Sequence, residues 1–429
     1  MKPVWKFTLI ASLGGFLFGF ETAVISGAEQ IIQKLWQLNA VRHGLTVSIS
    51  LIGTILGAII AGQLTNRYGR KPMLYAIALL YLLSAIGCAL ASIWEVFLLF
   101  RFFGGLAVGI SSVVGPVYTS EIAPAKDRGK LTGTFQIMIV TGIFTAYLTN
   151  FVFLGIETDA WRYMLGIMAL PALLFVILVR GIPESPRWLL QVGNSNKARK
   201  SYTVLGEEEM LYGPMTESRD VRPSKQVNLF QKRYAKPIVL AVLLAFFNQM
   251  TGINAILYYA SRIFEMAGFS AALAYLQPIF IGGTNLLFTL IGMSIIDRFG
   301  RKKLLLTGAV GMFFFLLLSA YGLKGVHADY LLFFIIGFIA AFALSQGAVI
   351  WVFLAEIFPN EVRAQGSSLG STTHWFFAAI ISWLFPIIVE GTVLGGFYAF
   401  LFYAIMVVLS FIFILFLPET KGRALEEIK

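Results

Sequence analysis

Twelve apolar runs follow one another along the chain, separated by polar segments. A helix needs about 20 apolar residues to cross the hydrocarbon core of a bilayer, and each run is about that long. The first six lie near residues 7–27, 44–64, 72–92, 95–118, 131–153 and 163–181. The other six lie near residues 237–260, 272–296, 303–323, 330–356, 367–390 and 395–417. The pattern predicts an all-α integral membrane protein with twelve transmembrane helices.

The distribution of basic residues predicts the orientation of these helices. If both termini are cytoplasmic, 27 of the 33 Lys and Arg residues fall in cytoplasmic segments, and Arg101 falls inside the fourth run. The five in external loops are Lys34, Arg42, Arg162, Arg262 and Lys324. The positive-inside rule therefore favours cytoplasmic termini, and it explains the net charge of +11 without a nucleic acid partner. His43 and His327 also fall in external loops, where we assign them no function.

Three motifs occur twice, in the same order. Residues 66–71 recur at 297–302, Glu121-Ile122-Ala123-Pro124 recurs at 356–359, and Pro183-Glu184-Ser185 recurs at 418–420. Repetition at a nearly constant offset indicates a duplicated six-helix unit. The sequence therefore predicts two pseudo-symmetric halves, with a polar cytoplasmic segment between them and a short tail. The expected bounds are 1–182 for the first half, 183–235 for the linker, with an amphipathic helix around 194–205, 236–417 for the second half and 418–429 for the tail.

Taken together, the motifs resemble those of the sugar porter family of the major facilitator superfamily. The resemblance covers nearly the whole chain. It rests on GFLFGFETAVISG (15–27), NRYGRK (66–71), RFFGGLAVG (101–109), EIAPAKDRG (121–129), PESPRW (183–188), NQMTGINAILYY (248–259), DRFGRK (297–302), EIFPNEVR (356–363) and PETKGRALEEI (418–428). It implies the major facilitator fold and a secondary transporter that imports a monosaccharide by alternating access.

The seventh run carries residues suited to a sugar. Hydroxyl groups need paired donors and acceptors, which side-chain amides supply, and the spacing of Gln249, Asn254 and Tyr258 places them on one broad helix face. Gly252 lies between them and is expected to loosen the helix. The resemblance implies sugar-binding positions at Phe18, Gln136, Asn248, Gln249, Asn254, Tyr258, Asn285, Gly347, Trp351, His374 and Trp375. The alternative is that the amides only hold helices together by hydrogen bonds.

Three of these positions depart from the pattern of the family. Asn248 stands where many members have Gln, His374 stands where Gln or Asn is common, and the segment from Gly347 to Trp351 lacks the prolines of many relatives. The departures leave the choice of sugar open. His374 is also a candidate pH switch, although a hydrogen-bonding role is the more ordinary one.

Glu21 is an acidic residue in the middle of the first apolar run, where ionisable groups are costly and usually functional. Arg101 is the only basic residue well inside a run, so we expect the two to pair. In proton-coupled sugar porters an acid at the matching position faces the arginine of the fourth span, whereas facilitative members tend to have a neutral residue. The resemblance therefore implies a proton-coupling pair. The alternative is a permanently ionised pair that only fixes the packing.

Arginines and carboxylates gather at the expected cytoplasmic helix ends. Forks between arginine and carboxylate there are expected to hold the two halves closed on the inside and to break when the transporter opens. The alternative is positive-inside anchoring alone. The gate residues are Arg67, Arg70, Glu121, Arg128, Glu184, Arg187, Asp297, Arg298, Arg301, Glu356, Arg363 and Glu419.

Other functional classes find little support. The chain has no nucleotide-binding loop, metalloprotease helix or nucleophile elbow, so we expect neither an enzyme nor a cofactor or metal site. Facilitated diffusion of a sugar or polyol remains open. A non-transporting sugar sensor is disfavoured because the tail after Pro418 is short. We expect a protein of the bacterial inner membrane that functions as a monomer.

Overall fold

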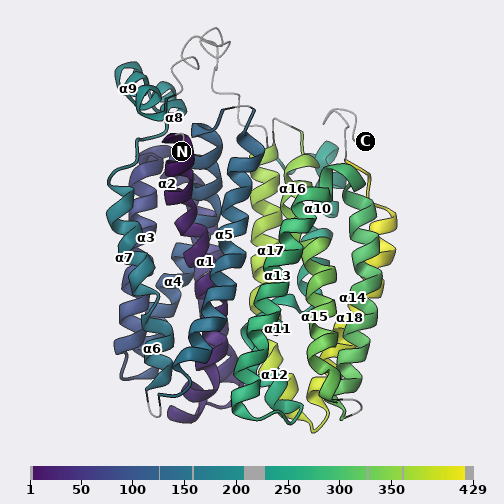
Figure 1. Cartoon of the computed structure of the whole chain (residues 1–429). Coiled ribbons are helices and arrows are strands. Elements are labelled where there is room, and N and C mark those ends of the chain that lie inside the picture. The colour runs from purple at the N-terminus through teal and green to yellow at the C-terminus, as the bar shows by residue number, and fades with distance from the viewer. Residues whose placement is uncertain are drawn as a thin grey trace. The chain divides into compact units, whose positions relative to one another are not determined.

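The computed structural model describes residues 3–124, 126–156, 159–206, 228–325, 328–359 and 362–420, without the side chains of Asp297, Ala355 and Ala364. Within these residues all the regular structure is helical (Figure 1). Twelve segments are long and apolar enough to cross a membrane. The predicted all-α architecture with twelve spans is therefore confirmed. Of the residues discussed above, His327 and the side chain of Asp297 lie outside the description.

Nine of the spans are continuous helices. They are α1 (Pro3–Leu35), α2 (Ala40–Tyr68), α3 (Arg70–Leu90), α4 (Trp94–Ile122), α5 (Arg128–Phe153), α13 (Ala271–Phe299), α14 (Arg301–Leu323), α17 (Arg363–Gly391) and α18 (Gly395–Leu415). The helix α1 is longer than the apolar run that predicted it, because it continues past Gly27 to Leu35.

The other three spans are interrupted helices. The sixth consists of α6 (Ala160–Gly166) and α7 (Ala169–Val179), and the tenth of the turn η4 (Ala328–Tyr330), α15 (Leu331–Leu344) and α16 (Gln346–Glu356). The seventh consists of the turn η3 (Lys232–Tyr234), α10 (Ala235–Met250) and α11 (Ile253–Tyr258), and α12 (Ala260–Met266) follows it.

Two backbone conformations account for two of these breaks. Gly252 has φ 79°, in the left-handed region that favours glycine, so the predicted weakening of the seventh span is confirmed. Ser345, with φ −116° and ψ −93°, separates α15 from α16. The apolar runs near 163–181 and 330–356 predicted the sixth and tenth spans but not their breaks, because apolar periodicity does not report a local break within a span.

The chain forms two compact units. The first comprises Met1–Glu21, Gly53–Ile143 and Leu165–Gln226, and the second comprises Thr22–Ile52, Phe144–Met164 and Val227–Lys429. In the first unit α3 packs against α4 and α7. Small residues bring backbones close together there: a Cβ at Gly53 or Gly57 of α2 would collide with the backbone of α4 at Phe102 and Leu106.

The second unit contains the ends of four helices from the first half of the sequence, α1, α2, α5 and α6. Its core is formed by α14 against α15 and α18, and by α10 against α17. The Tyr147 hydroxyl of α5 donates to the Leu257 carbonyl at 2.7 Å. The Tyr275 hydroxyl of α13 donates to the Gly27 carbonyl of α1 at 2.7 Å. These buried hydrogen bonds attach α1 and α5 to helices of the second half.

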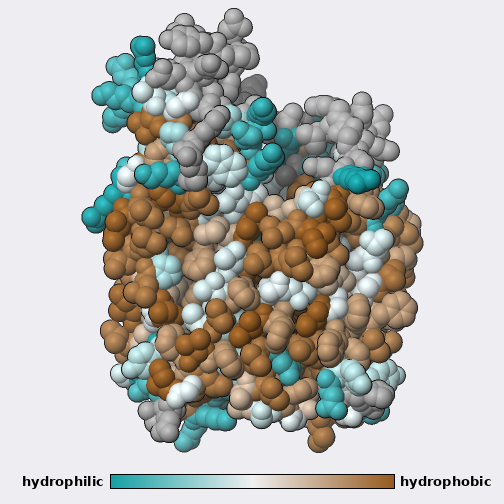
Figure 2. All heavy atoms as spheres, viewed as in Figure 1, coloured by the Kyte–Doolittle hydropathy of each residue, from teal (hydrophilic) through white to brown (hydrophobic). Residues whose placement is uncertain are grey.

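Large apolar side chains cover the outward faces of the spanning helices. Leu83, Leu174, Val310 and Ile412 are each more than two fifths exposed, and Figure 2 shows apolar residues along the middle of the helices and hydrophilic residues toward their ends. Exposed apolar surface of this extent marks an interaction surface. On twelve segments that are long and apolar enough to cross a membrane, such a surface is expected for an integral multi-pass membrane protein.

Two short helices begin the linker, α8 (Pro186–Gln191) and α9 (Ser195–Leu205). The Asn194 side chain accepts a hydrogen bond from the Lys197 N–H at 3.3 Å, and Gly206 ends the helix at φ 69°. These are ordinary caps at the two ends of a helix. The predicted helix around 194–205 is confirmed, whereas 207–227 and 421–429 lie outside the described residues.

Candidate substrate and proton site

Three amide side chains of the seventh span meet at the break between α10 and α11. Asn254 Nδ2 donates to Gln249 Oε1 at 2.6 Å, and Gln249 Nε2 donates to Asn248 Oδ1 at 2.9 Å. All three side chains are buried. The Gly252 conformation turns the chain between Gln249 and Asn254, so that residues five apart come into direct contact.

A histidine of α17 contacts the same amides. Gln249 Nε2 lies 3.1 Å from His374 Nδ1 and 3.0 Å from Nε2. Because an amide nitrogen donates, the ring nitrogen that receives this hydrogen bond is unprotonated. Asn248 Nδ2 is buried and has no acceptor among the described residues. The cluster thus combines fixed donors and acceptors with at least one donor that remains unused within the described part of the chain.

Aromatic rings adjoin the amides. The Trp351 ring of α16 lies 4.9 Å from the His374 ring and 6.4 Å from the Trp375 ring, between centroids. Trp375 is buried and Trp351 is partly exposed. Polar hydrogen-bonding groups beside aromatic faces suit a ligand that has hydroxyls on its edge and C–H groups on its faces.

The other expected sugar-binding residues are distributed over five helices. Tyr258 is buried in α11, and Asn285 Oδ1 of α13 accepts a hydrogen bond from the Thr289 hydroxyl at 3.4 Å. Gly347 lies in α16. Phe18 of α1 and Gln136 of α5 belong to the first compact unit. The structure therefore brings together the amides of the seventh span with His374, Trp351 and Trp375. These residues belong to the second compact unit, and Phe18 and Gln136 do not.

Glu21 and Arg101 form a buried ion pair within the first unit. Arg101 Nη1 of α4 donates to Glu21 Oε1 of α1 at 2.5 Å, and the side chains are 1% and 3% exposed, Arg101 being the more buried. Arg101 Nε and Nη2 have no acceptor among the described residues. An arginine with unsatisfied buried donors is costly.

The repeated motifs of the first half build a compact charged cluster. Arg70 Nε and Nη2 both donate to the Glu121 carboxylate at 2.8 Å, joining α3 to α4. Glu184 Oε1 accepts from the Arg70 and Lys71 backbone N–H groups at 3.0 and 3.2 Å. A carboxylate at the first turn of α3 stabilises the helix dipole. Burial raises the pKa of the Glu184 carboxyl, and these backbone donors oppose that shift.

The second half repeats the cluster residue for residue. Arg301 Nε and Nη2 donate to the Glu356 carboxylate at 3.1 and 2.9 Å, and Glu419 accepts from the Arg301 and Lys302 backbone N–H groups at 2.9 and 3.0 Å. Gly300, at φ 89°, lets the carboxylate approach, since a Cβ there would lie 2.7 Å from Glu419 Oε2. These forks join helices of the same half. A latch between the halves stays a prediction.

The remaining gate positions contribute less to these clusters. The Arg363 Nε donates to the Phe358 carbonyl at 3.4 Å, and the Arg67 guanidinium lies 5.3 Å from the Tyr68 ring. Arg298 is exposed in α13, Arg128 begins α5 and Arg187 lies in α8.

Comparison with known proteins shows which sequences this chain resembles. A family model for "Sugar (and other) transporter" matches residues 7–429. The putative metabolite transport protein YwtG of Bacillus subtilis is 39% identical over 435 residues, which cover 99% of this chain and 94% of that protein. The D-xylose-proton symporter of Escherichia coli is 34% identical over 475 residues, which cover 99% and 95%.

A solved structure agrees with the sequence comparisons. The xylose transporter XylE of E. coli, in a partially occluded inward-open conformation, has a TM-score of 0.86 at 33% identity and covers 99% of this chain and 100% of that one. The chain belongs to the sugar porter family of the major facilitator superfamily. This sugar porter is therefore a transporter and not an enzyme, and the predicted fold of two six-helix halves is confirmed.

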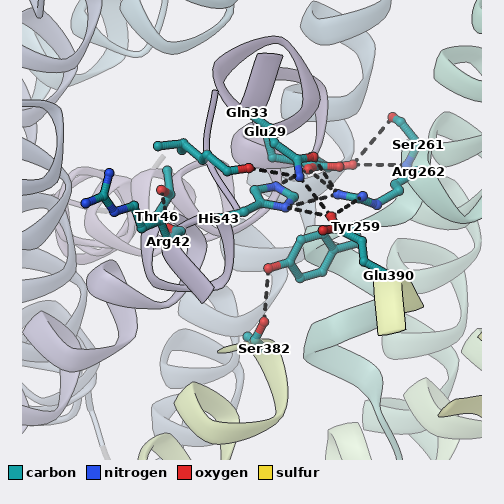
Figure 3. Close-up of polar contacts among 12 residues, drawn as sticks. Glu29, Gln33, Arg42, His43, Thr46, Tyr259, Ser261, Arg262, Ser382 and Glu390 are labelled. Carbon is teal, nitrogen blue, oxygen red and sulfur yellow. Dashed lines mark hydrogen bonds and ion pairs between the residues drawn. The ribbon is translucent and has the colours of Figure 1, made fainter. Parts of the chain in front are cut away.

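A second charged cluster in this sugar porter was missed by the sequence analysis. His43 was assigned to an external loop without function, but it lies in α2 with a fully buried side chain, 2.5 Å from Glu29 of α1. Arg262 of α12 and Glu390 of α17 complete the cluster (Figure 3). The sequence signals were weak: each residue lies at the end of an apolar run, and Arg262 and Glu390 are far from Glu29 and His43 in the chain.

Proposed function

We propose that this sugar porter imports a monosaccharide, a pentose or hexose, together with a proton by alternating access. Its E. coli relative is a D-xylose-proton symporter by name, which supports both the substrate class and the coupling. The observation that carries the proposal is the buried Glu21–Arg101 pair, in which two guanidinium nitrogens have no acceptor among the described residues.

The pair can couple a proton to a conformational change. Contact with Arg101 stabilises ionised Glu21. If the two separate, the carboxylate is left in an apolar environment that favours its protonated form. A carboxyl that alternates between these two environments takes up a proton in one conformation and releases it in the other. In this mechanism Glu21 carries the proton and Arg101 determines when it is held.

The amide cluster is the proposed sugar site. Asn248, Gln249 and Asn254 would exchange hydrogen bonds with the sugar hydroxyls, His374 would add a further polar contact, and Trp351 would pack on the C–H face of the ring. Trp375, Tyr258, Asn285, Gly347, Phe18 and Gln136 are assigned to the same site through the family resemblance. The departures at Asn248, Gly347 and His374 make the choice between pentose and hexose a matter for experiment.

Orientation and assembly complete the proposal. Both termini are assigned to the cytoplasm, on the distribution of basic residues, in a bacterial plasma membrane. The two halves, 1–182 and 236–417, rock about the sugar site, and the charged clusters around Arg70 and Arg301 form the cytoplasmic gate. A monomer suffices, because one chain contains the whole pathway.

The test is the change of external pH when sugar is added to de-energised cells or right-side-out vesicles that contain the protein. D-xylose, D-glucose, D-galactose, L-arabinose and myo-inositol are compared, with Glu21→Gln alongside. Symport predicts alkalinisation that accompanies uptake of one or more sugars and disappears in the variant. Uptake without a pH change, equally fast in Glu21→Gln, would make the protein a uniporter and leave Glu21 a structural residue.

A further inference from the structure

Four ionisable side chains from four helices meet in the second compact unit. They are Glu29 of α1, His43 of α2, Arg262 of α12 and Glu390 of α17 (Figure 3). The side chains of Glu29 and His43 are fully buried, and those of Arg262 and Glu390 are 14% and 31% exposed. By the proposed topology this end of the helices faces outside, so the inference that follows rests on the proposed function for its direction.

The contacts of His43 define its protonation state. Nε2 lies 2.5 Å from Glu29 Oε2, and Nδ1 lies 3.0 Å from Arg262 Nη1. A guanidinium can only donate hydrogen bonds, so Nδ1 accepts and carries no proton. The single ring N–H is then on Nε2, the nitrogen that lies against the Glu29 carboxylate. The closed arrangement therefore contains a neutral imidazole that bridges a carboxylate and a guanidinium.

The same arginine joins the two halves of the sequence. Arg262 Nη2 donates to Glu390 Oε1 at 2.7 Å, and Nη1 donates to Gln33 Oε1 of α1 at 3.0 Å. Gln33 Nε2 in turn donates to Glu390 at 2.8 Å. Alternating access requires α12 and α17 to separate from α1 and α2 at this end. The contacts of Gln33 with Arg262 and Glu390, and that of His43 with Arg262, join the halves and must then break.

Packing around the cluster is tight. The Trp383 indole N–H of α17 donates to the Val41 carbonyl of α2 at 3.1 Å, and a Cβ at Gly44 would collide with the Trp383 backbone. The Ser261 N–H donates to Ser26 Oγ at 3.3 Å. The unit is therefore closed at this end, and the charged cluster lies inside the closed contact.

We propose that His43 is a second proton-binding site of the transport cycle, which takes up a proton when this end opens and releases it when the end closes. A proton on Nδ1 would point at an N–H of Arg262, so the protonated ring and the closed arrangement exclude each other. When Arg262 leaves, Nδ1 becomes free to bind a proton. Glu29 remains on the partner nitrogen, because α1 and α2 belong to the same half, and it stabilises the imidazolium.

The other charged groups near the ring do not change the conclusion that the closed arrangement disfavours a protonated His43. Glu390 Oε1 lies 3.9 Å from His43 Nδ1 and would favour a protonated ring, but it is bound by Arg262. The Tyr259 ring lies edge-on to His43, at 5.8 Å between centroids, and its hydroxyl donates to the Ser382 carbonyl. Arg42 adds a positive charge one residue away in α2.

One neighbouring carboxyl needs its own control. Burial, and next the charge of Glu29, raise the pKa of the Glu265 carboxyl of α12, while Gln30, Lys34 and Arg262 oppose the shift. Glu265 can therefore titrate nearer to neutral pH than an ordinary glutamate. A pH response of the gate that disappeared in Glu265→Gln would belong to that residue and not to His43.

The experiment measures opening directly as a distance between the halves. Spin labels are placed at Val41→Cys and Val393→Cys, which are exposed positions on α2 and beside α17, in a Cys88→Ser background that removes the only cysteine. Distance distributions are recorded from about pH 8 to pH 5, the range in which histidine titrates. The proposal predicts that acid increases the long-distance population, by up to about tenfold per pH unit for one linked proton.

Substitutions at His43 and Glu265 show which residue causes the pH response. His43→Gln keeps a donor and an acceptor but does not titrate, so its distances should not respond to pH, whereas Glu265→Gln should respond like the parent. If His43→Gln does not fold, Arg262→Gln serves instead, because its amide oxygen can accept from a protonated Nδ1, and it should lose most of the response. A label pair at Leu35 and Val41, both in the first half of the sequence, should not move.

Three outcomes would overturn the proposal: an unchanged pH response in His43→Gln, a response lost in Glu265→Gln, or acid that shortens the distance. Glu21→Gln separates this site from the proposed coupling pair. If the variant abolishes sugar-driven proton uptake but keeps the distance response, both proposals stand. If the parent protein shows sugar-driven proton uptake but its label distances do not respond to pH, only the proposal for His43 fails.

Discussion

Gly104 of α4 lies directly against the carboxylate of Glu21. A Cβ at this position would lie 2.5 Å from Glu21 Oε1 and 2.5 Å from Ser84 Oγ. The absence of a side chain at position 104 is therefore what allows a carboxylate, an arginine and a serine to share one buried space. The ion pair depends on this glycine as much as on its own two charges.

We predict that Gly104→Ala impairs transport by displacing Glu21 from Arg101. Overpacking a buried site costs about 1–3 kcal/mol. If the whole cost falls on the transport step, the rate of sugar-driven proton uptake decreases about 5- to 160-fold. Gly62→Ala in α2 is the matched control, because nothing lies within 4 Å of a Cβ there. Equal rates in the two variants would show that the Glu21 carboxylate tolerates displacement.

The fork between Arg70 and Glu121 predicts that lysine cannot replace arginine at position 70. Arg70 holds Glu121 with two parallel hydrogen bonds, and an ammonium cannot reproduce that fork. We expect Arg70→Lys to lower the stability by about 1–2 kcal/mol, measured by thermal unfolding in detergent. Arg301→Lys should behave similarly, because its fork to Glu356 has the same geometry.

Arg67→Lys provides the control for this comparison. Arg67 belongs to the same sequence motif but is exposed, so the melting temperature should stay within experimental error of the parent. A loss as large as that of Arg70→Lys would mean that positive charge at this end, and not the fork, stabilises the helices.

The parts of the fold that were predicted correctly depend on neighbours in sequence or on repetition. The twelve spans follow from apolar length, and the clusters around Arg70 and Arg301 follow from motifs that occur twice. The pairing of Glu21 with Arg101 was predicted because two lone charges inside apolar runs have few other partners. Each of these inferences uses information that a single helix or a repeated motif carries.

The parts that were missed depend on tertiary contacts or on local backbone conformation. His43 acquires its role only because α1, α2, α12 and α17 meet, and none of these helices alone indicates the others. The break at Ser345 arises from a backbone conformation that serine does not demand. The contact of His374 with Gln249 likewise needs both α10 and α17 in place, so the sequence predicted the residues but not their hydrogen bonds.

The hydrogen bonds among Asn248, Gln249 and Asn254 predict separate effects on sugar affinity and on stability. Asn254→Ala removes the donor that orients Gln249 and, in the proposed site, a contact to the sugar. Loss of a hydrogen bond worth about 1.4 kcal/mol weakens binding about tenfold, which calorimetric titration with D-xylose and D-glucose would measure. Because Asn254 donates to a residue of its own span, the melting temperature should decrease less than in a variant that loses a contact between helices.

Asn150→Ala should give the opposite result. Asn150 Nδ2 of α5 donates to the Val24 carbonyl of α1 at 3.1 Å and is buried, so its loss should lower the melting temperature and leave sugar affinity unchanged. If Asn254→Ala also lost stability without losing affinity, the amides of the seventh span would be holding helices together and the sugar site would lie elsewhere.

The break in the seventh span makes Gly252 irreplaceable for two reasons. Its φ of 79° strains any residue with a Cβ, and that Cβ would also collide with the Tyr403 ring of α18.

Gly268 separates the two effects, since its φ is 89° but nothing would lie within 4 Å of a Cβ there. We expect Gly268→Ala to cost about 1 kcal/mol of stability from strain alone. Gly252→Ala should cost a further 1–3 kcal/mol, about the usual penalty of overpacking, and should abolish sugar binding by misplacing Gln249 and Asn254. Thermal unfolding and titration with sugar measure the two effects, and equal losses in both variants would mean that the Tyr403 contact adapts to the added carbon.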